Sequence, residues 1–597
     1  MDNNNYYPFD AQYLLKNKKR IKRELVTGLR EDAIEKNVAI LGGVTTRDIM
    51  QVLELFLLQY GIRPRFYESE YNQYYEDGMF DNPKLEKFKP DIIYICTSVR
   101  NINEFPSVSD DASEVNNKRE EVFNRFISLW ESLDNKYHCA IIQNNFEYPF
   151  FRLLGNMDSY DIHGRVNFVT ELNRAFYEYA RGHQNFHICD INYISASYGL
   201  EKWSDPYYWH MYKYALAVPA IPYLSFNVAN IIKSIYGKNK KVLNLDLDNT
   251  LWGGVIGDDG ADNIEIGQED AVAQTYSEFQ NYLRLYKELG ILLTVNSKND
   301  MENAKSGFER SDSILKMDDF VSFKANWDPK SQNLLETAEE LNILPESFVF
   351  IDDNPAERAI VKSQIPGVEI PDIDSPEHYI NIIDKSGFFE PTSLSSDDYE
   401  RSRMYQENVK RIAMQSKFES YYDYLKSLEM YAEIRSFVSE YMSRIAQLTN
   451  KSNQFNLTTK RYTQSEIEQV ATDDKHITLY GRLQDKFGDN GVVSVVIGEI
   501  RGQKQDEAHI ELWLMSCRVL KRNMEFAMMD SLVEKCKDLG ISTIYGYYYP
   551  TMKNGMVKDF YLTLGFDKYE KNDKGTVWRY GIPCDYKNKQ DVINVNR

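Results

Sequence analysis

The chain has few cysteines, and they lie far apart. Its six cysteines are spread over 597 residues without a Cys-x-x-Cys pair: Cys96, Cys139, Cys189, Cys517, Cys536 and Cys584. In a chain of this size, such spacing argues against both a disulfide framework and a zinc site. We therefore expect reduced thiols in a cytoplasmic protein.

Acidic residues outnumber basic ones, and no segment is strongly basic. The chain carries 70 Lys and Arg against 90 Asp and Glu, a net charge of −20, and it has no long basic run. Nucleic acid and anionic membrane surfaces attract basic proteins, so we expect neither as the main partner. A small acidic ligand remains compatible with this composition, because a local basic pocket can exist in an acidic protein.

The sequence has no evident leader or membrane span. Its first ten residues, MDNNNYYPFD, lack the basic segment and apolar run of a signal peptide. The most apolar stretch, residues 215–232, is interrupted by two prolines and several polar residues. We predict a buried helix there, since a membrane span needs about 20 predominantly apolar residues.

Apolar runs that alternate with helical periodicity are present from about Asn37 onward. The runs are VAILGG, RPRFYES, DIIYICTS and CAIIQNN, and helical stretches such as 46–60 and 119–133 separate them. This alternation predicts a parallel sheet with crossover helices. The pattern is interrupted at SIYGKNKK, so we place a first α/β domain at residues 1–236.

Further domains are expected because the length exceeds what one hydrophobic core supports. A second α/β sheet begins at VLNLDLD and defines a domain at 237–392. Residues 393–430 are assigned to a linker, in which 397–430 is predicted to be one long polar helix. Residues 431–597 mix strands with helices and form an α+β domain. The predicted fold class is therefore α/β, with three domains and one helical linker.

Two aspartates follow the first strand of the second domain. In LNLDLDNTLWGG, Asp246 and Asp248 are two residues apart, so their side chains share one direction if the backbone stays extended. They lie at the carboxyl end of a strand, where open α/β sheets bind ligands. Such a pair can also be a solvated turn, and the rest of the domain decides between the two interpretations.

Other polar residues of this domain favour a phosphoryl-transfer site. Ser297 ends the strand ILLTVNS, Lys330 follows in WDPKSQN, and FVFIDD ends in Asp352 and Asp353. Carboxylates hold Mg²⁺ through oxygen, and the metal lets an anionic carboxylate approach a phosphate. A lysine and a hydroxyl stabilise the phosphoryl oxygens during transfer. The order of these groups along the chain, each near the end of a strand, favours a metal-dependent phosphoryl-transfer reaction.

This set of residues resembles the haloacid dehalogenase (HAD) superfamily of phosphatases and phosphotransferases. The resemblance implies that Asp246 is the nucleophile and that Asp248 is the general acid and base. It assigns phosphate binding to Ser297 and Lys330, and Mg²⁺ binding to Asp246, Asp248, Asp352 and Asp353. The segments between these residues are too short for a separate cap domain. We therefore expect an open site that suits a macromolecular substrate or is covered by a neighbouring domain.

A longer set of motifs is more specific. DLDNTLWGGVIGDDG, NSKN, FKANWDPK, FVFIDDNPAER and QFNLTTKRYT resemble the FkbH-like family, and the similarity extends from the first sheet to the C-terminus. It implies a HAD-like domain without a large cap, preceded by an SGNH-like or flavodoxin-like domain and followed by a GNAT-like domain.

The FkbH-like resemblance also implies a substrate. Members of that family take a glyceryl unit from 1,3-bisphosphoglycerate, remove its remaining phosphate and load the unit as a thioester on an acyl carrier protein. Relatives that transfer glyceryl often have a cysteine where this chain has Asn296. That departure bears on the substrate and not on the phosphatase centre.

The last domain resembles GNAT-type acetyltransferases, but its cofactor loop departs from their pattern. Those enzymes bind a pyrophosphate through Arg-x-x-Gly-x-Gly/Ala, and here CRVLKRN places Lys521 and Asn523 at the glycine positions. We therefore expect no acetyl-CoA chemistry. Arg518, Lys521 and Arg522 are candidates to bind a phosphopantetheine arm, with an exposed basic turn as the alternative.

Cys517 directly precedes these cations. Nearby positive charge favours a thiolate, so Cys517 is a candidate acyl relay to a carrier protein. Packing at the end of a strand is the alternative.

The first domain resembles SGNH-type hydrolases without their nucleophile. Its LGGVTT turn has Gly43 and Val44 where a serine is expected, and Asp205 and His210 are five residues apart rather than three. An esterase activity is therefore not expected. Asn145 is a candidate for an oxyanion pocket, with a structural role as the favoured alternative.

Three functions fit these features. The first is a Mg²⁺-dependent HAD-type phosphatase and glyceryl transferase that feeds an acyl carrier protein. The second is a HAD phosphatase for another phosphorylated metabolite of polysaccharide or secondary metabolism. The third is a docking scaffold for a carrier protein, which the complete set of site residues argues against.

Overall fold

The chain divides into two compact units, which we describe separately. The computed structural model describes residues 7–30, 33–415, 417–452, 454–572 and 574–596. The first unit consists mainly of Phe9–Tyr236, and the second mainly of Gly237–Tyr462 and Ile467–Arg597. The division after Tyr236 falls where we placed the end of the first domain.

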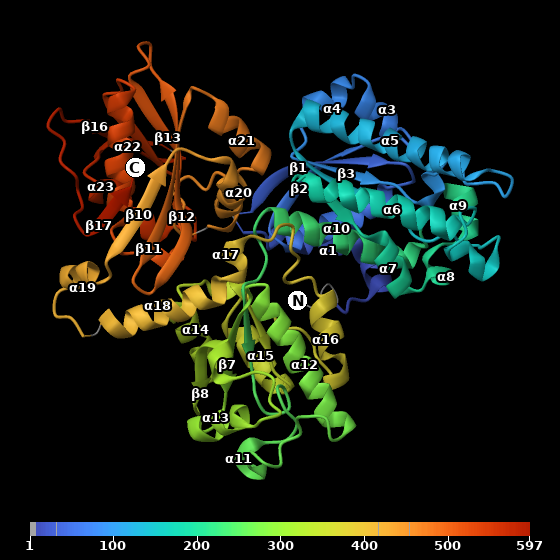
Figure 1. The fold of residues 1–597 in the computed structure, drawn as a ribbon, viewed down its shortest axis with the longest axis horizontal. Coiled ribbons are helices and arrows are strands. Elements are labelled where there is room, and N and C mark those ends of the chain that lie inside the picture. Colours follow the sequence, from blue (N-terminus) through green and yellow to red (C-terminus); the bar gives the residue numbers. More distant parts are fainter. Residues whose placement is uncertain (1–6, 31–32, 416, 453, 573, 597) are drawn as a thin grey trace. The chain divides into compact units, whose positions relative to one another are not determined.

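The first unit contains an all-parallel sheet with the strand order β2-β1-β3-β4-β5 (Figure 1). The four apolar runs recognised in the sequence form its first four strands. Most of their residues are buried, as expected for parallel strands that lie between two layers of helices. The strands are β1 (Ile34–Gly42), β2 (Ile62–Glu68), β3 (Ile92–Cys96), β4 (Ala140–Asn144) and β5 (Phe186–Cys189).

Helices pack on this sheet in two groups. Ala39 and Leu41 of β1 share a core with Phe126 and Trp130 of α5, while α1, α2 and α10 pack against one another. The α-helices are α1 (Ala11–Thr27), α2 (Arg47–Gln59), α3 (Tyr74–Met79), α4 (Pro83–Phe88), α5 (Ala112–Tyr137), α6 (Arg165–Gly182), α7 (Ile191–Tyr198), α8 (Leu200–Trp203), α9 (Pro206–Tyr212) and α10 (Ile221–Ile235). Single turns of 3₁₀-helix are η2 (Val99–Asn101), η3 (Gly155–Ser159) and η4 (Val218–Ala220).

The most apolar stretch of the sequence is largely the buried helix α10. The helix starts only at Ile221, with Pro222 in its first turn, where the missing proline N–H leaves no helical hydrogen bond unmade. Among the described residues, no helix combines the length and apolar character needed to cross a membrane.

The second unit begins with a smaller parallel sheet in the order β8-β7-β6-β9. Its strands are β6 (Val242–Leu245), β7 (Leu292–Ser297), β8 (Phe320–Ala325) and β9 (Phe348–Ile351). Strand β8 was not predicted. It lies at the edge of the sheet, where Ser322 and Lys324 interrupt the apolar run that marks the inner strands.

Helices of this part connect the parallel strands and flank the sheet. They are α11 (Ile256–Asp259), α12 (Ala271–Glu288), α13 (Met301–Glu309), α14 (Lys330–Glu340), α15 (Pro355–Gln364) and α16 (Pro376–Lys385), with the 3₁₀ turns η5 (Met317–Asp319) and η6 (Pro345–Ser347).

The predicted linker is not one long helix. Residues 397–430 contain the end of α17 (Ser396–Tyr399), then α18 (Arg401–Gln415) and α19 (Tyr421–Ser427), and Met430 already belongs to a strand. The Ser420 side chain accepts a hydrogen bond from the Asp423 N–H, so α19 starts with its own cap. The single-helix prediction was therefore wrong, because polar periodicity alone does not reveal a local cap.

A larger mixed sheet follows, with the strand order β15-β16-β14-β13-β12-β11-β10-β17. Only β13–β14 and β10–β17 are parallel pairs, which agrees with the predicted α+β, GNAT-like fold. The strands are β10 (Met430–Arg435), β11 (His476–Asp485), β12 (Gly488–Arg501), β13 (Glu507–Met515), β14 (Thr543–Tyr548), β15 (Asp567–Asn572), β16 (Gly575–Gly581) and β17 (Ile593–Asn596). The helices are α20 (Met442–Lys451), α21 (Gln464–Thr472), α22 (Met524–Asp538) and α23 (Phe560–Thr563), with the 3₁₀ turns η7 (Ser439–Tyr441), η8 (Cys517–Val519) and η9 (Gly555–Val557).

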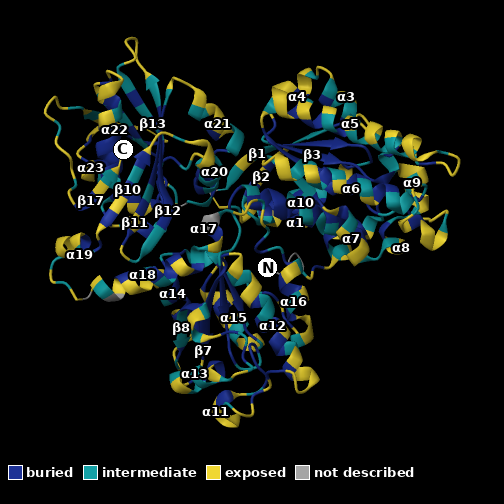
Figure 2. Cartoon of the chain, in the orientation of Figure 1, coloured by how far each residue is buried: buried dark blue, intermediate teal, exposed yellow. Residues whose placement is uncertain are grey.

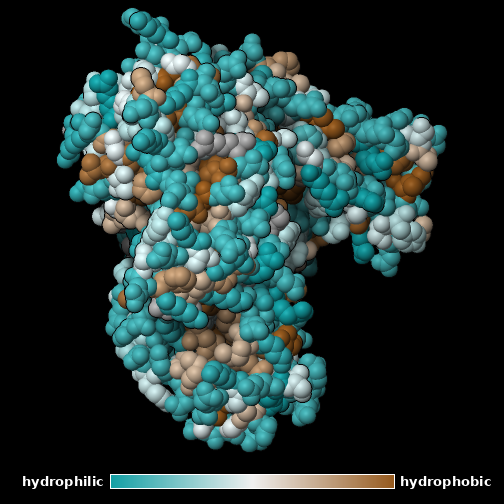
Figure 3. Space-filling model, turned by 60° about the vertical axis from the view of Figure 1, so that its left-hand side comes forward, coloured by the Kyte–Doolittle hydropathy of each residue, from teal (hydrophilic) through white to brown (hydrophobic). Residues whose placement is uncertain are grey.

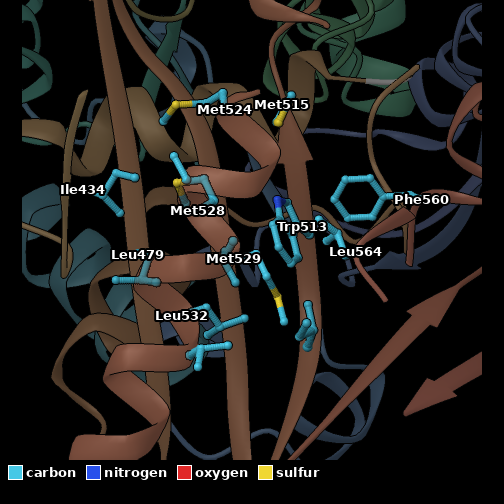
Figure 4. Packing of buried hydrophobic residues seen from close by; sticks show 14 of the residues in the cluster. Ile434, Leu479, Trp513, Met515, Met524, Met528, Met529, Leu532, Phe560 and Leu564 are labelled. Carbon is cyan, nitrogen blue, oxygen red and sulfur yellow. The ribbon is translucent and has the colours of Figure 1, made fainter. Parts of the chain in front are cut away.

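Methionines and Trp513 are among the residues that form the core of this sheet. Met524, Met528 and Met529 of α22 point toward the strands that carry Leu479 and Trp513 (Figure 4). Thioethers adapt to irregular gaps, which suits a core between a helix and a twisted sheet. Figure 2 shows the inner strands of the three sheets as largely buried, whereas the edge strand β15 is exposed along its length.

A short segment is inserted where β13 and β14 diverge. The two strands are paired only up to Ile510 and Gly546. Beyond this point the segment Phe455–Thr458 hydrogen-bonds to β13 and to Tyr549, which directly follows β14. Leu457 N donates to Trp513 O at 3.1 Å, and Tyr549 N donates to Leu457 O at 2.9 Å. The chain's own backbone therefore satisfies the polar groups that the divergence would expose.

The molecular surface agrees with the composition. On the face drawn in Figure 3, hydrophobic residues form separate patches among hydrophilic ones.

Candidate active site

The polar residues predicted to form a site meet at the carboxyl edge of the smaller parallel sheet. Asp246 follows β6, and Asp352 follows the neighbouring strand β9. Lys330 is the first residue of α14. Parallel strands all end at the same edge, so residues far apart in sequence converge there.

Lys330 connects two of the carboxylates. Its Nζ lies 2.9 Å from Asp246 Oδ2 and 2.6 Å from Asp352 Oδ2. All three residues are buried. Burial opposes the charged lysine, but the two carboxylates outweigh it and raise the pKa of Lys330. The ammonium therefore stays protonated at neutral pH.

Three carboxylates lie close enough to share one cation. One ligand oxygen from each of Asp246, Asp352 and Asp353 lies within 4.8 Å of the others. Burial and the Asp246 charge raise the pKa of Asp352 to about 6 and also raise the pKa of Asp353. Lys330 supplies one positive charge to three acids, so the oxygen donors and their excess negative charge fit a divalent metal such as Mg²⁺.

The side chain of Asp248 is not part of this group. Its Oδ1 accepts hydrogen bonds from Trp252 Nε1 at 2.9 Å and from Ile256 N at 3.0 Å, and its Oδ2 accepts one from Asn299 Nδ2 at 3.0 Å. The sequence assigned this carboxylate to the metal ligands, and the structure instead surrounds it with protein donors. Burial raises the pKa of Asp248, while the hydrogen bonds from Ile256 N and Trp252 Nε1 oppose that shift.

Ser297 ends β7 and is almost fully buried. Its carbonyl accepts a hydrogen bond from Asn326 N at 3.1 Å. Within the described parts of the chain its hydroxyl has no hydrogen-bond partner, so the hydroxyl remains available to a ligand.

A buried amide network supports the site, and sequence reasoning missed it. Asn296 donates to Lys330 O at 2.8 Å and to Asn244 Oδ1 at 3.0 Å, and it accepts from Asn333 at 3.3 Å. Asn296 therefore holds the start of α14, where Lys330 begins. Asparagines inside apolar strands were the available signal, since buried amides need partners.

The expected lack of a large cap is confirmed. Residues 246–330 are described throughout, and they contain only α11, α12, α13, two strands, a 3₁₀ turn and connecting loops. They provide no additional domain over the carboxylates.

The cations of the C-terminal loop are placed differently from the prediction. Arg518 and Arg522 are buried, and only Lys521 is exposed. Arg522 donates to Asp485 at 3.1 Å and to Asn408 at 2.6 Å, and Arg518 contacts Met404 and Ser516. An exposed basic turn is therefore wrong for these two arginines. Their guanidinium groups are also occupied within the fold, which contradicts their assignment to a pantetheine arm.

Backbone conformation in this loop matches the glycine pattern even though the residues do not. Lys521 and Asn523 have φ values of 64° and 62°, in the left-handed region that glycine adopts most readily. Cys517 is half-buried in η8, and its Sγ lies 3.5 Å from the Tyr405 hydroxyl.

The first unit shows no hydrolase triad among the residues considered for it. Gly43 and Val44 follow β1, Asp205 caps α9, and His210 is exposed on that helix. Asn145 donates to Asp190 at 2.6 Å and to Tyr177 at 2.7 Å, which supports its structural role.

The fold and the site thus define a multidomain α/β protein with an acidic centre of the HAD type in its second sheet. A family model described as FkbH, N-terminal domain, matches residues 37–233. The N-terminal part of the protein BF1531 from Bacteroides fragilis, which contains a phosphatase domain and was crystallised with Mg, is 30% identical. That similarity covers 64% of this chain and 99% of the other, with a TM-score of 0.59. The chain belongs to the FkbH-like family.

Two acetyltransferase structures resemble about a quarter of the chain. They are the ribosomal-protein-S18-alanine N-acetyltransferase from Escherichia coli (12% identity, 27% of this chain, 99% of that chain, TM-score 0.20) and a GNAT-family acetyltransferase from Streptococcus pneumoniae (14% identity, 26% and 99%, TM-score 0.21). No curated protein matches the chain.

Proposed function

We propose that this protein is a Mg²⁺-dependent phosphatase or phosphotransferase that acts through a phosphoaspartate at Asp246. The observation that carries the proposal is the ion pairing of Lys330 with both Asp246 and Asp352 at one strand edge. Buried carboxylates that converge on one lysine and leave excess negative charge are typical of sites that bind metal and phosphate. Similarity to a phosphatase-containing relative crystallised with Mg supports the same assignment.

Asp246, Asp352 and Asp353 would hold the metal. Bound Mg²⁺ would neutralise phosphate charge and so let a carboxylate approach. Arg358 donates to the Asp352 and Asp353 carbonyl oxygens at 2.8 Å each, which fixes the loop that carries the two acids.

The reaction divides into two displacements. In the first, an Asp246 oxygen bonds to phosphorus, the bond from phosphorus to the leaving oxygen breaks, and Asp248 gives that oxygen its proton. In the second, Asp248 takes a proton from water, the water oxygen attacks phosphorus, and the phosphoaspartate bond breaks. The Lys330 ammonium and the Ser297 hydroxyl donate hydrogen bonds to the phosphoryl oxygens in both steps.

A second, more specific proposal identifies the substrate and the acceptor. We infer a glyceryl unit derived from 1,3-bisphosphoglycerate, with an acyl carrier protein as the acceptor. Membership of the FkbH-like family and the absence of a large cap over the site support it, since a carrier-bound substrate needs an open approach. A phosphatase for another phosphorylated metabolite is the alternative that the same centre serves.

Phosphate release tests the centre. Asp246→Asn removes the nucleophile at nearly constant size, so release should fall to background while the unfolding temperature changes little. The exposed Asp262→Asn is the matched control and should keep full activity. Chelation by EDTA should stop the wild type, and added Mg²⁺ should restore it. Near wild-type release by Asp246→Asn would rule out the phosphoaspartate route.

Carrier loading tests the substrate. The protein is incubated with 1,3-bisphosphoglycerate and a carrier protein, and both proteins are weighed by mass spectrometry. Direct transfer breaks the acyl–phosphate bond as the carrier thiol forms the thioester. A relay would first place the glyceryl group on Cys517.

Cys517→Ala separates the two routes. An adduct on the wild type that disappears in the variant supports the relay, whereas undiminished carrier loading in the variant eliminates it. Phosphate release without any loading would favour the alternative substrate.

A further inference from the structure

The carboxyl edge of the first unit's sheet contains an arginine whose guanidinium has no hydrogen-bond acceptor among the described residues. The strand order changes direction between β1 and β3, and open α/β sheets bind ligands at such a point. Arg100 lies in η2, which is separated from β3 by two residues. It is therefore placed at the edge where this fold binds ligands.

Two aromatic rings enclose the Arg100 guanidinium. Its central carbon lies 4.9 Å from the ring centroid of Phe150 and also 4.9 Å from that of Trp209. The Nε atom is buried, and neither it nor the rest of the guanidinium has an acceptor within the described chain. A guanidinium carries five N–H donors, so holding it between rings without an acceptor leaves its hydrogen-bonding capacity for a ligand.

A second cation approaches the same tryptophan. Lys213 Nζ lies 5.3 Å from the Trp209 ring centroid. Lys213 ends α9 in a left-handed conformation, with φ of 60°, and its carbonyl accepts a hydrogen bond from Thr45 N at 3.1 Å. The loop after β1 therefore fixes the position of this lysine beside the ligand edge.

The nearest acid does not neutralise Arg100 by contact. Glu147 is fully buried, and its Oε2 accepts a hydrogen bond from Val99 N at 3.1 Å, while its Oε1 has no partner. The described residues include no ion pair between Glu147 and Arg100. The positive charge of the arginine thus faces the edge without a direct counter-ion.

This edge also lacks the groups needed for hydrolysis by a serine-type mechanism. Gly43 and Val44 stand where a nucleophile would be, and the Thr45 hydroxyl donates to Tyr212 O at 2.6 Å.

We propose that Arg100, held between Phe150 and Trp209 and assisted by Lys213, forms a binding site for a small oxyanion in the first unit. The ligand is a carboxylate or a phosphate ester, because both accept two parallel hydrogen bonds from a guanidinium. This site is separate from the phosphoryl-transfer centre in the second unit and does not depend on it.

Fluorine NMR of the full chain labelled with 5-fluorotryptophan tests the site. The chain has seven tryptophans, and the Trp209 resonance is identified by its loss in Trp209→Phe. Trp252 donates to Asp248, so its resonance reports separately on phosphate bound at the phosphoryl-transfer centre. Inorganic phosphate and acetate are titrated in turn at constant ionic strength.

We expect the Trp209 resonance to shift to saturation with at least one of the two anions. Arg100→Gln should weaken that binding by about tenfold or more, since a charge-assisted hydrogen bond contributes that much. Arg100→Lys, which keeps the charge but loses the planar fork, should show an intermediate loss. The exposed Arg174→Gln is the matched control and should bind like the wild type.

The titrations distinguish the two kinds of ligand and can also contradict the proposed site. Saturation with phosphate alone identifies a phosphate ester, and saturation with acetate alone identifies a carboxylate. A Trp209 resonance that neither anion moves, or that moves equally in Arg100→Gln, overturns the proposal. Unchanged resonances of the other tryptophans establish that the variants are folded.

Discussion

Buried charges differ in this protein according to what surrounds them. Lys330 is almost fully buried, yet two carboxylates stabilise its charge and direct it toward the proposed phosphoryl site. Arg522 is also buried, but its guanidinium donates hydrogen bonds to Asp485 and Asn408 within the fold. Arg100 has aromatic neighbours and, among the described residues, no hydrogen-bond acceptor for its guanidinium. All three residues are basic, and the groups that surround each one decide its role.

Glu147 allows a prediction about pH. Burial raises its pKa from 4.5 to about 7, so the folded state binds this proton more tightly than the unfolded state does. The bound proton of Glu147 contributes fully to the free energy of unfolding below pH 4.5, and this contribution is lost as the pH rises through 7. The total loss is up to roughly 3 kcal/mol. Glu147→Gln keeps an acceptor for Val99 N and cannot ionise. The variant should therefore gain stability relative to the wild type as the pH rises through this window.

Denaturant unfolding of both proteins between pH 4.5 and 8 measures this difference. The exposed Glu201→Gln serves as the control and should track the wild type at every pH. A difference between wild type and Glu147→Gln that is independent of pH would show that the carboxyl does not titrate in this range.

At the level of secondary-structure elements, α18 is part of the C-terminal fold rather than a free connector. Arg411 of α18 donates to both oxygens of Asp485 at 2.8 Å, and both residues are buried. Arg411→Met should lower the free energy of unfolding by about 3 kcal/mol, because it removes one partner of a buried ion pair.

Arg403, on the same helix, provides the comparison for Arg411. Its side chain is 57% exposed and its ion pairs are local, so Arg403→Met should change stability by about 0.5 kcal/mol or less. Urea unfolding measures both variants. Equal effects of the two substitutions would mean that α18 does not depend on the Asp485 contact.

The inserted segment Phe455–Thr458 is one reason to expect that the C-terminal sheet does not bind acetyl-CoA tightly. It occupies the divergence of β13 and β14, and Leu457 is fully buried there. In addition, Lys521 and Asn523 place side chains where a pyrophosphate would need bare backbone. We therefore expect no tight acetyl-CoA binding by calorimetry. A dissociation constant in the micromolar range or below would contradict this expectation.

For the whole molecule, the division after Tyr236 predicts independent folding. The first unit has its own sheet and core, so a fragment of residues 1–236 should be monodisperse and unfold cooperatively. Circular dichroism during thermal unfolding measures this. A fragment that aggregates or lacks a cooperative transition would mean that the first unit requires the rest of the chain.

Much of the architecture was predictable because its signals are local. The runs VAILGG, DIIYICTS and FVFIDD became strands β1, β3 and β9, since apolar runs of this length between turns are typical of buried parallel strands. Edge strand β8 was missed, because solvent on one side relaxes the apolar pattern. The long-helix prediction for 397–430 failed at Ser420, whose cap starts a new helix.

The sequence by itself determined which residues converge at the carboxylate site. Asp246, Lys330 and Asp352 follow or begin elements whose order is readable, and parallel strands bring their ends to one edge. Only the tertiary structure decided which groups are available. It turned the Asp248 carboxylate toward Trp252 and Asn299 rather than toward the other three acids, and it buried Arg518 and Arg522. It left the Arg100 guanidinium without an acceptor among the described residues. The reason is physical: burial and hydrogen-bond partners depend on residues tens to hundreds of positions away, which no local pattern records.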